Sequence, residues 1–406
     1  MKKYWQIILF AIIIRLLLSS FTFHQDIQTF NLAGKLVAEG NILNLYDYLP
    51  ALADNDPLKN LAVFNYPPAI YLFHGVFNFL FNLLRFPVNL FLLDSAANYG
   101  NILFNIHLLL LKLPYLIFDL LTAVVLYKLF TNENQKRLAL LLWLFNPINL
   151  YATFMMGQFD IIPTFFTILS IYFILKNKLN LAAFSLGAGI AFKIYPIFLI
   201  IPLIITGKNL FEKMKLFILA ILPYLFTILP YLSSHNFRST ALFANQSSKS
   251  LYAQIAVSGG ESIIIFPALL ILFYLIILIR KERSASWRTY LIPLLLFFIF
   301  THFHPQWLIW VTPFLILEIV NTGLKNVMPI IAIIISFIGS LFFFDPSLTI
   351  GLFAPLIPML HNSAGLWELL KIAPDINYSR SILQTLFAGS SLYLIYINFS
   401  NKNTSE

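Results

Sequence analysis

The sequence contains no cysteine and has few charged residues. The absence of cysteine excludes disulfides, a thiolate nucleophile and a cysteine-ligated metal. Only 11% of the 406 residues are charged, whereas 59% are hydrophobic. A soluble core cannot absorb that much apolar surface, so the composition predicts that lipid is the main solvent of the chain. The net charge of +9 is attributed to cytoplasmic loops, so it does not indicate a nucleic-acid-binding surface.

Long apolar runs fill most of the chain. Because a membrane-spanning helix needs about 20 apolar residues, these runs predict spans at about 5–23, 113–131, 138–156, 161–176, 215–232, 263–280, 288–303, 306–320, 327–344 and 381–398. Residues 180–206 are interrupted by Lys193 and Pro196, which predicts two short helices. Residues 67–111 either cross the membrane as a pair or lie partly along its surface. The sequence therefore predicts an all-α polytopic membrane protein of about 12–14 transmembrane helices, with one domain over residues 1–398.

The distribution of basic residues predicts the orientation. With the N-terminus in the cytoplasm, the inner loops hold 16 of the 26 lysines and arginines. Residues 24–66 then form a long first extracytoplasmic loop that contains surface helices. Residues 233–262 and 345–380 form later outer loops, and residues 399–406 form a cytoplasmic tail.

Two acidic residues fall independently on the predicted outer face. Asp26 follows the first helix by about one turn, where it is either a general base toward a hydroxyl or the N-cap of a helix over residues 26–37. Asp160 ends the turn Gly157-Gln158-Phe159-Asp160 between two spans. It either caps the next helix or binds sugar hydroxyls together with Gln158, because a carboxylate accepts hydrogen bonds and an amide both donates and accepts them.

A lysine and a histidine-containing segment are expected on the same face. Lys193 interrupts the apolar run 188–205, and a lysine at that depth either binds a phosphate or extends to lipid head groups. The segment 301–307 contributes His302, His304, Gln306 and Trp307. Hydrogen bonding to a phosphate or sugar is favoured there over a zinc site, because no third ligand lies nearby. Trp307 is either a sugar-stacking surface or a membrane-interface anchor.

Two charged residues lie within apolar helices. Arg15 and Asp119 fall at roughly matching depths, about 9–12 Å below the outer surface at 1.5 Å per residue. Their opposite charges predict a structural ion pair that holds the first helix against the helix at 113–131.

In this order, the motifs resemble those of the GT-C superfamily of integral-membrane glycosyltransferases. The closest likeness is to members that use polyprenyl- or dolichyl-phosphate mannose or glucose, such as GPI mannosyltransferase I and bacterial and archaeal relatives. The resemblance covers roughly residues 5–320. The matching marks are Asp26, residues 40–46, Asn65-Tyr66-Pro67-Pro68, residues 112–119, Asn146-Pro147, residues 157–160, residues 191–196 and His304.

The resemblance implies a GT-C fold and an inverting transfer of a hexose, mannose in the first place, from a polyprenyl-phosphate donor to an acceptor hydroxyl outside the cytoplasm. It assigns the catalytic base to Asp26 and contacts with the donor phosphate to Lys193 and His304. The other expected substrate-binding residues are Tyr66, Gln158, Asp160, His302, Gln306 and Trp307. The first loop lacks the paired acids of metal-dependent oligosaccharyltransferases, so no cofactor is expected and a divalent metal stays open.

The resemblance also implies a location and partners. The implied partners are the bilayer, the lipid-linked donor and a glycan, lipid or protein acceptor. The implied location is a bacterial or archaeal plasma membrane or, in a eukaryote, the ER. Two other activities stay open. A flippase or transporter would be expected to show an inverted repeat and midplane charges. A polymerase or ligase of lipid-linked oligosaccharides would be expected to have an arginine-rich late outer loop, whereas 345–380 has only Lys371 and Arg380.

Overall fold

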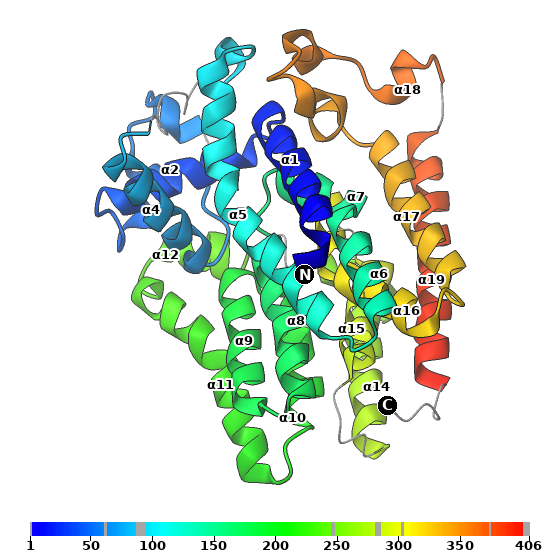
Figure 1. The fold of residues 1–406 in the computed structure, drawn as a ribbon. Helices are drawn as coiled ribbons and strands as arrows, with labels where there is room; N and C mark the ends of the chain where they lie inside the picture. Colours follow the sequence, from blue (N-terminus) through cyan, green and yellow to red (C-terminus); the bar gives the residue numbers. More distant parts are fainter. Residues whose placement is uncertain are drawn as a thin grey trace.

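The computed structural model describes residues 2–60, 63–86, 95–244, 248–280, 286–301, 304–372 and 375–400. Regular structure within these ranges is almost entirely helical (Figure 1). Most of the predicted tail, residues 401–406, lies outside them.

The described residues of the first half of the chain form helices α1 to α11, most of which are labelled in Figure 1. They are α1 (Trp5–Phe21), α2 (Asp26–Ala38), α3 (Leu45–Ala51), α4 (Pro68–Leu83), α5 (Ile102–Lys128), α6 (Glu133–Leu144), α7 (Pro147–Asn149), α8 (Ile161–Leu175), α9 (Leu179–Phe192), α10 (Ile200–Ile204) and α11 (Leu210–Ile228). A π-helical segment, η4 (Leu150–Met155), continues α7.

The second half adds a short hairpin and the remaining helices. They are α12 (His235–Phe237), β1 (Gln254–Ser258), β2 (Glu261–Ile264), α14 (Ile265–Ile279), α15 (Trp287–Phe300), α16 (Thr312–Thr322), α17 (Val327–Phe342), α18 (Leu366–Leu369) and α19 (Ile376–Ser400). A 3-10 helix, η9 (Pro305–Trp310), links α15 to α16.

The lengths and composition of the helices are those of a membrane protein. Among the described residues, Ile102–Lys128, Glu133–Met155, Leu210–Tyr231 and Ile376–Phe399 are long and apolar enough to cross a bilayer. Eight shorter apolar helices accompany them. Large apolar side chains are exposed on the outer helices, and only lipid can cover such a surface. The prediction of an all-α polytopic membrane protein is therefore confirmed, while the number of spans stays a prediction.

The first predicted outer loop contains helices, as expected. α2 follows α1 after a bend of 89°. It packs against α4, and both lie on one flank of the molecule beside α5 (Figure 1). α3 lies in the same stretch of chain.

α5 begins earlier than the span predicted at 113–131. The Asn101 side chain accepts a hydrogen bond from the backbone N–H of Leu103 and so caps a helix that starts at Ile102. Two polar residues of its first turns, Asn105 and His107, are buried, and the Asn31 Nδ2 atom lies 3.3 Å from His107 Nε2. Residues 102–111 are thus the first part of α5 and not a separate element, because their polar side chains face α2.

The region around Lys193 is broken, as its sequence predicts. α9 ends at Phe192, and Lys193 has an extended backbone with φ −156° and ψ 135°. A 3-10 turn over Tyr195–Leu199 and the short helix α10 follow.

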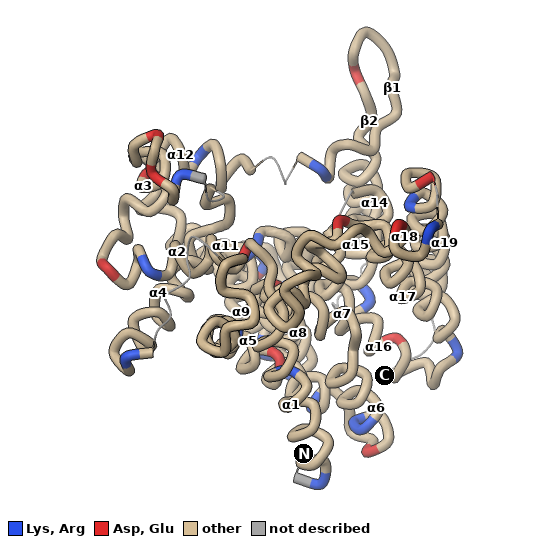
Figure 2. Tube along the Cα trace, turned by 90° about the horizontal axis from the view of Figure 1, so that it is seen from above, with Lys and Arg blue, Asp and Glu red and all other residues tan. Residues whose placement is uncertain are grey.

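The hairpin β1–β2 is a small departure from an all-helical chain. Its antiparallel strands pair Gln254 with Ile264 within the predicted outer loop 233–262. Figure 2 shows it projecting away from the helices.

Arg15 and Asp119 meet inside the helix bundle. The Arg15 Nε donates to Asp119 Oδ2 over 2.6 Å, and both side chains are buried. Asn149 Nδ2 donates to the other carboxylate oxygen over 2.6 Å, and an Arg15 guanidinium N–H donates to the Leu144 carbonyl over 2.9 Å. The pair thereby connects α1 and α5 to the segment that precedes Gly157-Gln158-Phe159-Asp160.

Candidate active site

A cavity of about 280 Å³ lies where the start of α2 meets the segments at 63–66 and 304–307. Five of the residues expected at the site line it: Asp26, Tyr66, His304, Gln306 and Trp307. Gln158 and Lys193 are not part of the lining but contact residues that are, and Asp160 pairs with Lys193 behind it. His302 lies outside the described residues.

Asp26 presents a carboxylate to this cavity. Its Oδ2 accepts a hydrogen bond from Gln158 Nε2 over 2.7 Å, and its side chain is 33% exposed. α2 starts at Asp26 itself, with Gln25 at the N-cap position and no side-chain capping bond. The alternative that Asp26 caps this helix is therefore wrong. A carboxylate that a hydrogen bond orients and that is partly exposed to the cavity is suited to act as a general base.

His24 stands beside this carboxylate. Its Nδ1 lies 3.6 Å from Asp26 Oδ2 and accepts a hydrogen bond from the Asp26 backbone N–H over 3.3 Å. Burial lowers the pKa of His24, although the charge of Asp26 opposes this shift. The imidazole is therefore neutral at pH 7 and carries its proton on Nε2. The signal in the sequence that could have identified His24 was its position two residues before Asp26.

The turn that delivers Gln158 depends on Gly157. Gly157 has φ +68°, in the left-handed region that favours glycine. A Cβ there would lie 2.9 Å from Ile27 Cδ1 and 3.0 Å from Lys112 Cε. Glycine thus allows the close approach that brings the fully buried Gln158 against Asp26. Within the described part of the chain, Gln158 Oε1 has no hydrogen-bond partner.

Lys112 holds the same region together through hydrogen bonds to two segments. It is fully buried in α5, and its Nζ donates to the carbonyls of Thr22, Phe154 and Met155 over 2.6, 2.9 and 3.2 Å. It therefore binds the end of α1 to the end of η4. A lysine inside an apolar run was a signal that the sequence analysis did not use.

Asp160 and Lys193 form a buried ion pair. The Lys193 Nζ donates to Asp160 Oδ1 over 2.7 Å, and Trp310 Nε1 donates to the same oxygen over 2.5 Å. The two charged side chains are 0% and 8% exposed. Asp160 occupies the N-cap position of α8, as one alternative predicted, but its side chain makes no capping hydrogen bond.

Aromatic rings surround the Lys193 ammonium. The centroids of Tyr66, Phe159, Trp307 and Trp310 lie 5.0–5.5 Å from its Nζ. Lys193 therefore neither lines the cavity nor extends to lipid head groups. The reason is electrostatic: a charged lysine removed from water is stabilised by an anionic partner, and Asp160 supplies one here. Its charge lies behind Tyr66 and Trp307, which do line the cavity.

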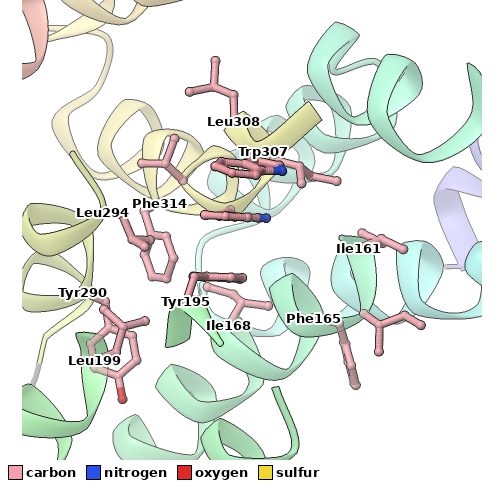
Figure 3. Close-up of a cluster of buried hydrophobic side chains, with 14 of the residues drawn as sticks. Ile161, Phe165, Ile168, Tyr195, Leu199, Tyr290, Leu294, Trp307, Leu308 and Phe314 are labelled. Atoms are coloured by element: carbon pink, nitrogen blue, oxygen red, sulfur yellow. The ribbon is translucent and has the colours of Figure 1, made fainter. Parts of the chain in front are cut away.

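A stack of rings fixes Trp307. Its ring lies 5.2 Å from that of Trp310 at 14°, and Trp310 lies 4.1 Å from Tyr195 at 2°. Figure 3 shows Trp307 and Tyr195 in this buried cluster. Trp307 is only 5% exposed, so it is part of the core and not an interface anchor.

His304 is paired with a lysine that the sequence analysis missed. The Lys249 Nζ lies 2.9 Å from His304 Nε2. Because an ammonium group can only donate, Nε2 accepts. Burial lowers the pKa of Lys249 below its ordinary range. Nothing in the sequence distinguished Lys249 from other loop lysines. In the described ranges no three histidine, aspartate or glutamate side chains gather in a metal-binding arrangement.

The fold and the cavity define a polytopic membrane protein with a carboxylate and a histidine–lysine pair in one polar site. Residues 154–222 match a family model described as Mannosyltransferase (PIG-M). This range contains Gln158, Asp160 and Lys193.

Relatives in three yeasts agree with this match. GPI mannosyltransferase 1 of Kluyveromyces lactis is 33% identical over 95 residues, which is 23% of this chain and 23% of that protein. The Saccharomyces cerevisiae protein of the same name is 32% identical over 97 residues, 23% of this chain and 24% of that protein. The Candida albicans one is 28% identical over 133 residues, 31% and 32% of the two chains. The matched stretch thus spans a quarter to a third of each relative, and the resemblance to GPI mannosyltransferase I is confirmed.

Proposed function

We propose that this protein transfers mannose from a polyprenyl-phosphate-linked donor to an acceptor hydroxyl, with inversion at the anomeric carbon. The observation that carries the proposal is the cavity in which Asp26 is exposed and whose wall also holds His304, paired with Lys249. A base and a cationic pair thus face one space. The mannosyltransferase names of the similar proteins support mannose as the sugar.

The chemistry needs only one carboxylate. Asp26 takes the proton of the acceptor hydroxyl while the hydroxyl oxygen attacks the anomeric carbon. The bond from that carbon to the phosphate oxygen breaks, and the phosphate leaves with the electron pair. A phosphate departs without a protonating acid when cations stabilise its charge, so a second carboxyl group is not required. A single displacement inverts the configuration.

The cation for the phosphate is Lys249, acting together with His304. The resemblance assigns this contact to Lys193, but Asp160 neutralises that charge. The four aromatic rings around the Lys193 ammonium form an aromatic cage that encloses the pair. Lys193 is therefore a positioning residue, which holds Tyr66 and Trp307 in the cavity wall. These two rings offer surfaces on which the donor sugar stacks.

The proposed orientation follows from the charge distribution of the loops, and the proposed partners follow from the family resemblance. The N-terminus lies in the cytoplasm and the cavity on the extracytoplasmic side. The acceptor is a glycan, a lipid or a protein. The membrane is a plasma membrane, or the ER membrane in a eukaryotic cell.

Incubation of the purified protein with a membrane extract as the source of acceptor, and with polyprenyl-phosphate mannose or polyprenyl-phosphate glucose as the donor, tests this function. Sugar release from the mannose donor is expected with the wild type, and about 100-fold less with Asp26→Asn, the scale of lost general-base catalysis. Release from neither donor would overturn the proposed activity. Release from the glucose donor alone would overturn the assignment of the sugar.

A further inference from the structure

A second and larger cavity, of about 760 Å³, lies beside the candidate active site. It is bounded by α17, the first half of α19, residues 252–253 and 299–301, and Pro305, and we call it the α17–α19 groove. The two helices lie side by side at one edge of the molecule (Figures 1 and 2). Thr301 and Pro305 line the groove, whereas His304 and Gln306 line the catalytic cavity. The two spaces share no lining residue and are separated by this one segment.

Part of the groove wall is apolar, and the helices that form it also carry lipid-facing side chains. Phe337 and Phe387 contribute buried rings to its wall. The outward faces of the same helices carry exposed Ile335 and Ile382. A surface of this kind is covered by bilayer lipid, so a lipid chain can enter between the two helices.

Two buried hydroxyl groups in the wall lack partners. Thr301 and Ser336 are 3% and 1% exposed, and both line the groove. In the described part of the chain, neither Thr301 Oγ1 nor Ser336 Oγ has a hydrogen-bond partner. Buried hydroxyls are normally satisfied, so these two point to a polar group of a ligand.

Arg380 supplies a cation at the groove. Its guanidinium lies 4.5 Å from the ring centroid of Phe344. No carboxylate of the described residues forms an ion pair with it. An arginine stays charged at any physiological pH, and its planar donors match a phosphate. Next to lipid-facing helices, the anion of matching chemistry is the phosphate of a membrane lipid.

We propose that the α17–α19 groove binds a phosphate-bearing lipid, with the phosphate on Arg380 and the chain along Phe337 and Phe387. This ligand site is additional to the catalytic cavity and does not depend on the proposed sugar transfer. Two lipids share the required chemistry, a polyprenyl phosphate and a glycerophospholipid.

Native mass spectrometry of the full chain tests the proposal. The probes are polyprenyl phosphate and phosphatidic acid, each with its uncharged counterpart, polyprenol or diacylglycerol. The wild type is expected to bind at least one phosphate lipid about tenfold more tightly than its counterpart, the scale of one charge-assisted contact. The variants are compared in a Lys249→Gln background, which removes the proposed phosphate contact of the catalytic cavity, and there Arg380→Gln should abolish this preference. Lys371→Gln, at the other basic residue of 345–380, should leave it unchanged.

A second variant separates loss of charge from loss of the groove. Ser340→Trp places a large ring at a lining position of the groove. It should weaken the binding of both phosphate lipids, while the melting temperature stays near that of the wild type. A preference for polyprenyl phosphate assigns the groove to the donor lipid, and one for phosphatidic acid assigns it to a glycerolipid. Equal binding of charged and uncharged lipids by the wild type, or an unchanged preference in Arg380→Gln, would overturn the proposal. These binding results require no turnover, so they are independent of whether sugar transfer is observed.

Discussion

The Gln158 side-chain amide donates a hydrogen bond of 2.7 Å to the Asp26 carboxylate, across 132 residues of sequence. Two residues further along the same turn, Asp160 pairs with Lys193 over 2.7 Å. One short turn therefore orients the proposed base on one side and anchors an aromatic cage on the other. Gly157 makes the turn possible through its positive φ and its close contacts.

Asp26→Asn is expected to lower turnover by about 100-fold or more, because an amide cannot take the proton of the acceptor hydroxyl. Donor binding should change little, since the replacement keeps the size of the side chain. Single-turnover sugar transfer and donor binding measured on the same preparation decide this. Turnover close to that of the wild type would remove the base role from Asp26.

Gln158→Glu is expected to shift the acid limb of the kcat/KM profile to higher pH. A second carboxylate next to Asp26 disfavours ionisation of the pair, so the pKa of the base rises and its active form appears at higher pH. Gln158→Leu serves as the control. It removes the hydrogen bond to the carboxylate without adding charge, so it should lower turnover and shift the acid limb to higher pH by less than Gln158→Glu does. Identical pH profiles for both variants would show that the contact with Asp26 is not maintained in solution.

Donor affinity is expected to fall as the pH rises through the titration of Lys249. Burial lowers the pKa of this lysine, so its proton is lost at a lower pH than for an ordinary lysine. The cation that holds the phosphate is present below that pKa and absent above it. Lys249→Arg should keep donor affinity constant over the same range, because the pKa of arginine is above about 12. Donor binding titrated against pH in both proteins is the measurement.

Replacing either partner of the Arg15–Asp119 pair is expected to destabilise the protein by about 3–5 kcal/mol, because the remaining charge is buried without its partner. Arg15→Leu combined with Asp119→Leu should recover part of that loss. Melting in detergent compares the two single variants with the double variant. A double variant no more stable than the worse single one would mean that the two residues are not energetically coupled.

An accessible tag on the hairpin would support the proposed orientation. Gly259 and Gly260 form its exposed turn, so an insertion between them should be tolerated and reachable from outside the cell or from the ER lumen. A tag after Gln135, in a predicted inner loop, should be shielded. Reversed accessibility of both tags would place the cavity on the cytoplasmic side.

Much of the architecture could be predicted from the sequence, because hydrophobic runs and their interruptions are local. The break at Lys193 was expected from one charge and one proline in an apolar run, and the chain does leave the helix there. The start of α5 was not expected, since the polar residues of its first turns looked unsuited to lipid. Asn105 and His107 are buried in the tertiary structure, in which His107 lies against Asn31 of α2.

By itself, the sequence determined that this is an all-α membrane protein, and it brought forward Asp26, Tyr66, His304, Gln306 and Trp307 as residues that share one site. Residue type and position along the chain were enough for that. Only the tertiary structure decided which charges pair. Asp160 and Lys193 are 33 positions apart and Lys249 and His304 are 55 apart, and no periodicity in the sequence predicts either contact. A buried charge takes the opposite charge or acceptor that the packing places within about 3 Å, and this depends on how distant segments meet.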